Sequence, residues 1–315
     1  MFRLQVLESV DSTNEVIKRA IEDGEPEGLA IRAYRQTGGY GRQGRAWKSP
    51  RGGMYESILL RPEVEMRELP TLALVVAIAV RRALASLVAD EQARRICIKW
   101  PNDVVLVGGD FGADCSTRDT ALELGGHTPC SDSPALENSP LGCSRRAELR
   151  AAHARQAQGL QASQTNAPSI KNLYFKLAGI SSEVHAGGIC VGIGVNVEPS
   201  EDAIEVGGKN APAYLADLGF GFTCEREAAI SAVGDAVLHE FEPLYRRWCD
   251  GGFAALSGEF AEHSMLEGRF VRMANQLGEV VCEGTVRGVD ASGRLLLRLE
   301  DGETKAVASG EVHLL

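Results

Sequence analysis

The segment GGYGRQG, residues 38–44, combines glycines at the spacing G-x-G-x-x-G with two arginines, Arg42 and Arg45, in and directly after it. Dinucleotide-binding loops use this spacing, but their third glycine opens a helix whose N-terminus holds the pyrophosphate. Pro50 and the glycine pair at 52–53 follow too closely for such a helix. We therefore predict a flexible loop whose arginines clamp phosphate oxygens. The alternative is a mobile surface loop with scattered charge.

Four other segments accompany this loop along the chain: DSTN at 11–14, KWPNDVVLV at 99–107, KLAGISSE at 176–183 and GIGVNV at 192–197. Together with QTGGYGRQGRAW at 36–47, this ordered set resembles the biotin protein ligases, in the form that lacks an N-terminal DNA-binding domain. The resemblance implies an α+β fold related to the class II aminoacyl-tRNA synthetase core, with a mixed sheet and helices on one side. It also implies a small C-terminal SH3-like β-barrel.

The resemblance implies a two-step reaction that uses ATP and biotin and requires Mg²⁺. A carboxylate oxygen of biotin attacks the α-phosphate of ATP, giving biotinyl-adenylate and pyrophosphate. A lysine of a biotin carboxyl carrier protein domain, in acetyl-CoA carboxylase or a related carboxylase, then attacks the acyl carbon. Adenylation brings an anion toward a polyanion and needs fixed positive charge. The resemblance implies Lys176 and Arg42 for this catalytic role; alternatively, Lys176 is a surface lysine at a strand start.

The resemblance also implies two sets of binding residues. The biotin set is Ser12, Thr13, Asn14, Gln36, Gly39, Tyr40, Arg42 and Lys176. The ATP set is Arg42, Arg45, Trp47, Asn102, Asp103, Lys176 and Asn196, and no protein cage for direct metal binding is expected. Hydroxyls and amides suit the neutral head of biotin, and an indole suits adenine. The alternative roles are structural: a helix cap at 12–14, a core anchor for Trp47 and an Asx turn at 102–103.

Two positions of the glycine loop depart from the arginine-rich form of the family. Tyr40 stands where many members carry another arginine, and Gln43 replaces a common basic residue. A loop with fewer charges attracts phosphate less strongly. We expect the loop to keep its specificity. The property that these two positions affect is how tightly the loop retains the adenylate.

Periodicity and turn residues predict the elements that must position these side chains. Residues 11–24 predict a short helix, with Ser12 and Glu15 as a capping box and Gly24 as its stop. Further helices are expected at 70–90, mostly buried, and at 223–248, amphipathic and capped by Thr223. Strands are expected within 29–37, 54–62, 96–107, 172–197, 270–274, 279–290, 293–300 and 303–308.

The composition changes between residues 109 and 170, where Val, Met, Trp and Tyr are absent and small and polar residues dominate. Such a segment cannot build a core, so we predict a mobile insert at about 109–171, at the tip of a hairpin that survives it. The expected domains are a catalytic domain at 1–265, which contains the insert, and an SH3-like domain at 266–315. The cysteines and histidines of the insert lack the close pairing of a zinc site: Cys115, His127, Cys130, Cys143 and His153.

Composition limits the possible partners. A net charge of −10 argues against a protein that coats nucleic acid, so an anionic ligand must meet a local basic cluster. The N-terminus lacks a signal peptide, the apolar run at 72–80 is too short to span a membrane, and the eight cysteines form no C-x-x-C pair. We expect a cytoplasmic protein without sequence-specific DNA binding or membrane association, either a monomer or a homodimer.

Two other functions stay open at the level of sequence. A lipoate-protein ligase or octanoyltransferase of the same superfamily also relies on a lysine beside an acyl carboxylate, although GRQGRAW and the C-terminal barrel favour biotin. A degenerate protein that binds biotin without chemistry is the other alternative, because Tyr40 and the insert depart from the family pattern.

Overall fold

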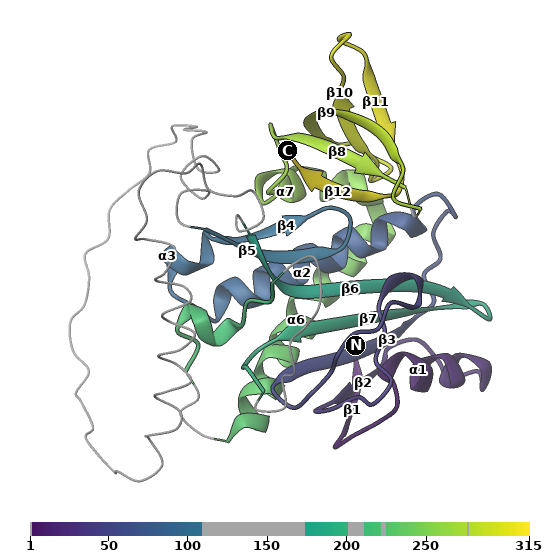
Figure 1. Ribbon diagram of the computed structural model, residues 1–315. Coiled ribbons are helices and arrows are strands. Elements are labelled where there is room, and N and C mark those ends of the chain that lie inside the picture. Colours follow the sequence, from purple (N-terminus) through teal and green to yellow (C-terminus); the bar gives the residue numbers. More distant parts are fainter. Residues whose placement is uncertain (1, 109–173, 201–210, 222–224, 276) are drawn as a thin grey trace, which may run out of the picture. The chain divides into compact units, whose positions relative to one another are not determined.

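The computed structural model describes residues 2–108, 174–200, 211–221, 225–275 and 277–315 (Figure 1). These residues fall within one compact unit. The insert expected at 109–171, with its cysteines and histidines, and the proposed cap Thr223 lie outside the described residues.

Seven of the described strands form one mixed sheet in the order β1-β2-β3-β7-β6-β5-β4 (Figure 1). β1 runs parallel to β2, and every other neighbouring pair is antiparallel. The strands are β1 (Arg3–Leu7), β2 (Leu29–Ala33), β3 (Gly53–Leu60), β4 (Ile96–Lys99), β5 (Asp103–Val107), β6 (Tyr174–His185) and β7 (Gly188–Asn196). β2 and β3 are buried along their whole length, whereas β1 is mostly exposed, as expected for an edge strand.

The two long helices, α2 (Leu72–Ser86) and α6 (Arg226–Gly251), pack on one face of the sheet, in one core with Ala30 and Ile58. The expected mixed sheet with helices packed on one side is confirmed for these two long helices, whereas the short N-terminal helix lies on the other side. The segment Leu69–Ser86 is long and apolar enough to cross a membrane by composition, but 61% of it is buried in the fold. A helix surrounded by core residues has this all-round apolar character.

The short helix α1 (Thr13–Glu22) packs on the opposite face. Ile17 and Ile21 form a separate cluster there with Ile31 and Leu59. The residues that precede these two in the strands, Ala30 and Ile58, belong to the core on the other face. Alternation along β2 and β3 sends successive side chains to opposite faces. The N-terminus of α1 is thereby held against the exposed face of the sheet.

The predicted capping box of α1 is wrong. Ser12 is the N-cap residue, but its side chain makes no capping hydrogen bond, and its backbone N–H donates to Asp11 Oδ1 over 2.8 Å. Glu15 does not reach back to the cap because its carboxylate accepts the hydroxyl of Tyr40. The predicted stop is confirmed, since α1 ends at Glu22 and Gly24 follows with a left-handed φ of 78°. The long helix α6 begins at Arg226, and its N-cap residue is Glu225, two residues after the predicted cap.

The hairpin that carries the insert is intact. β5 pairs with β6, and Val107 lies opposite Tyr174, on either side of the segment that the structure does not describe. The expectation that the hairpin survives the insert is confirmed. The remaining helical segments are α3 (Asp90–Ala93), α7 (Ser257–Glu262) and the 3-10 turns η1 (Arg42–Gly44), η2 (Leu69–Thr71), η4 (Leu215–Leu218) and η5 (Phe253–Ala255).

The C-terminal residues form a second antiparallel sheet in the order β11-β10-β9-β8-β12, as the predicted SH3-like barrel requires. Its strands are β8 (Phe270–Ala274), β9 (Val280–Val289), β10 (Leu295–Arg298), β11 (Thr304–Val307) and β12 (Glu311–Leu314). The last strand, β12, was not among the predicted strands. The turns expected at 290–293 and 301–302 are present, with Gly293 and Gly302 at positive φ.

An ion pair lies buried beneath the sheet, on the side of α6. Arg32 of β2 faces Glu56 of β3 across the ladder, and Arg32 Nε donates to Glu56 Oε2 over 2.7 Å. Both residues are almost completely buried. Arg32 also donates to Asp235 and to the carbonyl of Ser231, while Gly234 leaves room for the guanidinium.

Candidate active site

A cavity of about 680 Å³ lies on the face of the large sheet that carries α1, beside the N-terminus of this helix. The glycine loop, the turn between β4 and β5, and residues of β3, β6, β7 and β12 also line it. The structure brings ten of the predicted site residues together there: Thr13, Asn14, Gln36, Tyr40, Arg42, Arg45, Trp47, Asn102, Asp103 and Lys176. Three others, Ser12, Gly39 and Asn196, are not among its lining residues.

One end of the cavity is lined by neutral polar groups in a hydrogen-bonded chain. Gln36 Oε1 accepts from the backbone N–H and the hydroxyl of Thr13, at 2.8 and 3.0 Å. The Ser57 hydroxyl of β3 lies 2.7 Å from both Thr13 Oγ1 and Asn14 Oδ1. Thr13, Asn14 and Ser57 are all buried. Their mutual hydrogen bonds therefore fix the orientation of each donor and acceptor.

Close packing of β7 against this end depends on a glycine. A Cβ at Gly192 would lie 2.4 Å from Asn14 Oδ1 and 2.6 Å from Ser181 Oγ. No side chain fits at that distance, so Gly192 lets the amide of Asn14 and the hydroxyl of Ser181 share one small space. The end of the cavity therefore suits a small, neutral group that both donates and accepts hydrogen bonds.

A β-bulge directs Lys176 into the cavity. In the β5–β6 ladder, Val104 lies opposite Ala178 but Val105 lies opposite Lys176, so Leu177 is the extra residue of β6. A bulge shifts the alternation of the strand by one. Leu177 is fully buried in the core, while Lys176 faces the cavity together with Gly179.

Lys176 and Asp103, which both line the cavity, form an ion pair. Lys176 Nζ lies 2.7 Å from Asp103 Oδ1 and 5.0 Å from the centre of the Trp47 ring. Trp47 packs closely on β6 and β7, because a Cβ at Gly179 or Gly194 would lie within 3 Å of the indole. An ammonium group is thereby held beside an aromatic ring and a carboxylate, with about a quarter of its side chain exposed.

The glycine loop forms a tight hairpin. Tyr40 and Ala46 pair as an isolated bridge, and Gly41 N–H donates to the carbonyl of Arg45 over 2.8 Å. No α-helix follows Gly44, so the structure agrees with rejection of a dinucleotide-binding loop. At the tip, Arg42 Nη1 donates to Asn102 Oδ1 over 2.8 Å.

Basic side chains outnumber acidic ones in the cavity although the chain is acidic. Arg42, Arg45, Lys99 and Lys176 line it, together with the carboxylates of Glu56, Asp103 and Glu311. Burial lowers the pKa of the Lys99 ammonium, which lies 5.3 Å from the centre of the Tyr174 ring. Burial is also the main cause that lowers the pKa of Arg42. Cations held out of water attract phosphate and carboxylate groups more strongly than exposed ones.

Three predicted site residues, Ser12, Gly39 and Asn196, lie outside the lining of the cavity. Gly39 is needed by its own loop, since a Cβ there would lie 2.4 Å from Ser49 Oγ. Asn196 Nδ2 donates to the carbonyl of Lys176 over 2.9 Å and so fixes the strand that carries this lysine. Ser12 is buried, and within the described part of the chain its hydroxyl has no hydrogen-bond partner.

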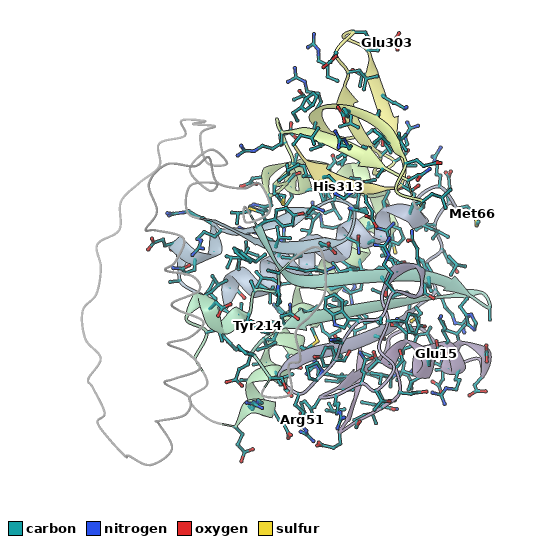
Figure 2. The ribbon with its side chains drawn as sticks, in the orientation of Figure 1. Glu15, Arg51, Met66, Tyr214, Glu303 and His313 are labelled. Atoms are coloured by element: carbon teal, nitrogen blue, oxygen red, sulfur yellow. The ribbon has the colours of Figure 1, made fainter. Side chains whose placement is uncertain are left out.

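Several lining residues were not predicted as site residues. Ser181 of β6 is one of them, and Ser57 of β3 lies behind the lining, bound to Thr13 and Asn14. Both are polar positions on alternating strands, which is the only signal that sequence offered for them. Glu311 and His313 come from β12, and His313 is labelled in Figure 2. Glu311 forms an ion pair with Arg45, a contact between segments that are remote in sequence.

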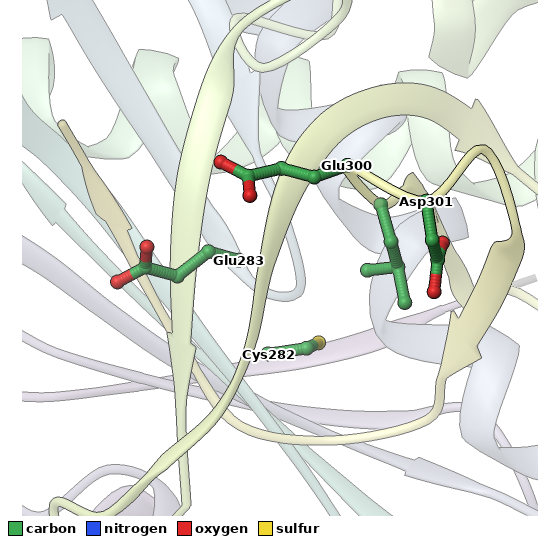
Figure 3. A pocket seen from close by; sticks show the side chains of 5 residues that line it. Cys282, Glu283, Glu300 and Asp301 are labelled. Atoms are coloured by element: carbon green, nitrogen blue, oxygen red, sulfur yellow. The ribbon is translucent and has the colours of Figure 1, made fainter.

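A second hollow lies on the C-terminal barrel, between Cys282, Glu283, Leu299, Glu300 and Asp301 (Figure 3). Glu283 and Asp301 stand on opposite sides of it in that view, and Glu283 is paired with Arg272. Within the described ranges, no group of three or more His, Cys, Asp or Glu side chains could hold a metal ion. The hollow has neither the cations nor the converging donors of the first cavity.

Comparison with known proteins identifies two matching family models. Residues 6–112 match the biotin/lipoate A/B protein ligase family, and residues 268–315 match the biotin protein ligase C-terminal domain. The first match includes the glycine loop and the β4–β5 turn, and the second includes the strands of the barrel.

Curated relatives carry matching names. The biotin–[acetyl-CoA-carboxylase] ligase of Mycobacterium tuberculosis (strain ATCC 25618 / H37Rv) is 25% identical over 319 residues, covering 99% of this chain and 89% of the relative. The enzyme of that name from Paracoccus denitrificans is 39% identical over 105 residues, 33% of this chain and 42% of the relative. The bifunctional ligase/repressor BirA of Bacillus subtilis (strain 168) is 35% identical over 102 residues, and the match spans 30% of its length.

Solved structures agree on the fold. The biotin protein ligase from Aquifex aeolicus, in complex with biotin and ATP, superposes with a TM-score of 0.63 at 23% identity, covering 100% of this chain and 99% of that one. The fold agrees with both matches, so residues 6–112 belong to the biotin/lipoate A/B protein ligase family and residues 268–315 to the biotin protein ligase C-terminal domain.

Proposed function

We propose that this protein is an ATP-dependent biotin protein ligase. The observation that carries the proposal is the division of one cavity into a neutral hydrogen-bonding end and a cationic end that includes Lys176. Biotin has a neutral ureido head and a carboxylate tail, and ATP is a polyanion. A site that activates one with the other needs both ends within one enclosed space.

The neutral end supplies the contacts for the head of biotin. Thr13, Asn14 and Gln36 are already oriented by hydrogen bonds to one another and to Ser57, so binding requires little further ordering. The unpartnered, buried hydroxyl of Ser12 is a further candidate group for the ligand. A buried hydroxyl without a partner is costly, and a bound polar group would remove that cost.

The cationic end supplies the environment for adenylation. Lys176 would meet the biotin carboxylate and the α-phosphate, and Arg42 would meet phosphate oxygens from the loop. The carboxylate oxygen attacks phosphorus and the bond to pyrophosphate breaks, so negative charge moves toward the leaving group. Trp47, held by the glycines of β6 and β7, is the proposed adenine platform.

The proposed requirement for Mg²⁺ agrees with the donor set. Asp103 is a partly buried carboxylate whose Oδ1 makes no hydrogen bond within the described residues, apart from its ion pair with Lys176. A single carboxylate suits Mg²⁺, which proteins bind with one or two carboxylates together with water and substrate phosphates. When bound, the ion would neutralise phosphate charge.

The second step needs a lysine from outside the chain. The amine of that lysine attacks the acyl carbon of biotinyl-adenylate, an amide forms, and AMP leaves with the electron pair of the broken acyl–oxygen bond. The names of the Mycobacterium and Paracoccus relatives support a carrier domain of acetyl-CoA carboxylase as the acceptor. We propose that the reaction takes place in the cytoplasm.

The first step can be tested with ATP labelled at the α-phosphate. Incubation with biotin and Mg²⁺ should produce labelled biotinyl-adenylate, and no adenylate should form when biotin is omitted. Lipoate in place of biotin separates the two acyl groups that the matched family covers. Formation of lipoyl-adenylate alone would identify a lipoate ligase, and binding of biotin without any adenylate would identify a non-catalytic protein. Either result contradicts the proposal.

A further inference from the structure

The hydroxyl of Tyr40, in the glycine loop, is held by two side chains of α1. Lys18 Nζ donates to Tyr40 Oη over 2.8 Å, and Tyr40 Oη donates to Glu15 Oε1 over 2.5 Å. Burial and the hydrogen bond to Glu15 raise the pKa of Tyr40 to about 12, so the hydroxyl keeps its proton and its donor role. The stem of the loop is therefore attached to α1 by a charge-assisted pair of hydrogen bonds.

Lys18 also reaches the large sheet. Its Nζ lies 2.6 Å from Glu183 Oε2 of β6, and its side chain is only 18% exposed. The ammonium lies 5.1 Å from the centre of the Tyr40 ring as well. One lysine thus contacts two carboxylates and one phenol, from three different segments of the chain.

These three segments carry the two ends of the proposed site. α1 begins with Thr13 and Asn14, and β6 carries Ser181 two residues before Glu183. The loop pairs Tyr40 with Ala46 at its stem, so a restraint on Tyr40 also limits the movement of Arg42 at its tip. A contact that joins the three segments sets the position of the cationic loop relative to the neutral end.

We propose that Lys18 is a positioning residue, which binds Tyr40, Glu15 and Glu183 at once and thereby holds the glycine loop against α1 and β6 over the bound intermediate. The proposal rests on the proposed function for its effect on biotinyl-adenylate. The contact also gives Tyr40, which stands where many family members carry an arginine, a role in retaining the adenylate. Tyr40 removes one cation from the loop, and a tether to a partly buried lysine on the neighbouring helix offsets that loss.

The tether can be tested without any ligand, by amide hydrogen exchange in the full chain. Lys18→Met keeps the length of the side chain and removes its charge. We expect exchange of residues 39–47 to become about tenfold faster, the effect of losing one charge-assisted hydrogen bond. Arg19→Met is the matched control. It removes a cation from the same helix, and the side chain of Arg19 is 60% exposed. Equal exchange in the two variants overturns the tether.

The effect on the intermediate is tested by the rate at which biotinyl-adenylate dissociates. Lys18→Met and Tyr40→Phe should each speed dissociation about tenfold, and the double variant about tenfold as well, because both changes break the same contact. In Lys18→Met, which changes no lining residue, the rate of adenylate formation should change much less. Effects that multiply in the double variant, or equal losses in formation and dissociation, contradict the proposal. If the unmodified protein forms no adenylate, the proposed function fails, and the exchange experiment still decides whether the tether exists.

Discussion

Replacement of Lys176 by methionine should slow adenylate formation by roughly a hundredfold. The change keeps an unbranched side chain of similar length and removes the ammonium that pairs with Asp103 at 2.7 Å. Two unit charges about 4 Å apart interact by about 4 kcal/mol at an effective dielectric constant near 20. The side chain is 23% exposed, and screening by water reduces the loss to about 3 kcal/mol.

The assay is the single-turnover rate of biotinyl-adenylate formation, measured at saturating biotin and ATP. Lys305→Met is the control, because it removes a lysine from β11 of the barrel. Thermal unfolding should show that both variants are folded. A loss below about fivefold in a folded Lys176→Met protein would refute the role given to this lysine, since one oxyanion-type donor usually contributes a hundredfold or more.

Three further changes test the neutral end, the buried ion pair and the insert. Gly192→Ala places a methyl group 2.4 Å from Asn14 Oδ1, so calorimetry should show biotin affinity reduced about tenfold or more; unchanged affinity would contradict the placement of biotin. Arg32→Met strands Glu56, and urea unfolding should show a loss of about 3–5 kcal/mol near pH 8. Burial raises the pKa of Glu56 to about 7, so its carboxyl becomes neutral as the pH falls, and the loss should shrink by about pH 5.5; a loss that grows instead would be inconsistent with this. Replacement of residues 109–172 by a short turn should retain adenylate formation, because Val107 and Tyr174 already pair, and loss of activity in a folded variant would show that the insert takes part.

The sequence predicted the elements whose signals are local. Apolar periodicity and turn residues located the long helices and most strands, and the composition of residues 109–170 separated the insert from the paired strands on either side of it. These features depend on residues that are neighbours in the chain. The order of the motifs supplied the family, and most of the residues that it implied meet in one cavity.

Features that depend on contacts between remote segments were missed. The capping box failed because Glu15 is used by Tyr40, a partner 25 residues away. The bulge at Leu177 arises from the register of two strands and has no signature in the residues themselves. Glu311 reaches Arg45 from the last strand of the barrel, which sequence patterns did not predict. Function is concentrated at these points, because the site is built where distant segments meet.

We propose that one cavity activates biotin with ATP for transfer to a carrier domain. The most direct measurement is the intact mass of a purified biotin carboxyl carrier domain after incubation with this protein, biotin, ATP and Mg²⁺. We expect the carrier domain to gain one biotinyl group in a reaction that requires ATP and that Lys176→Met slows strongly. A carrier domain that stays unmodified, or that gains only a lipoyl group when lipoate is supplied, would contradict it.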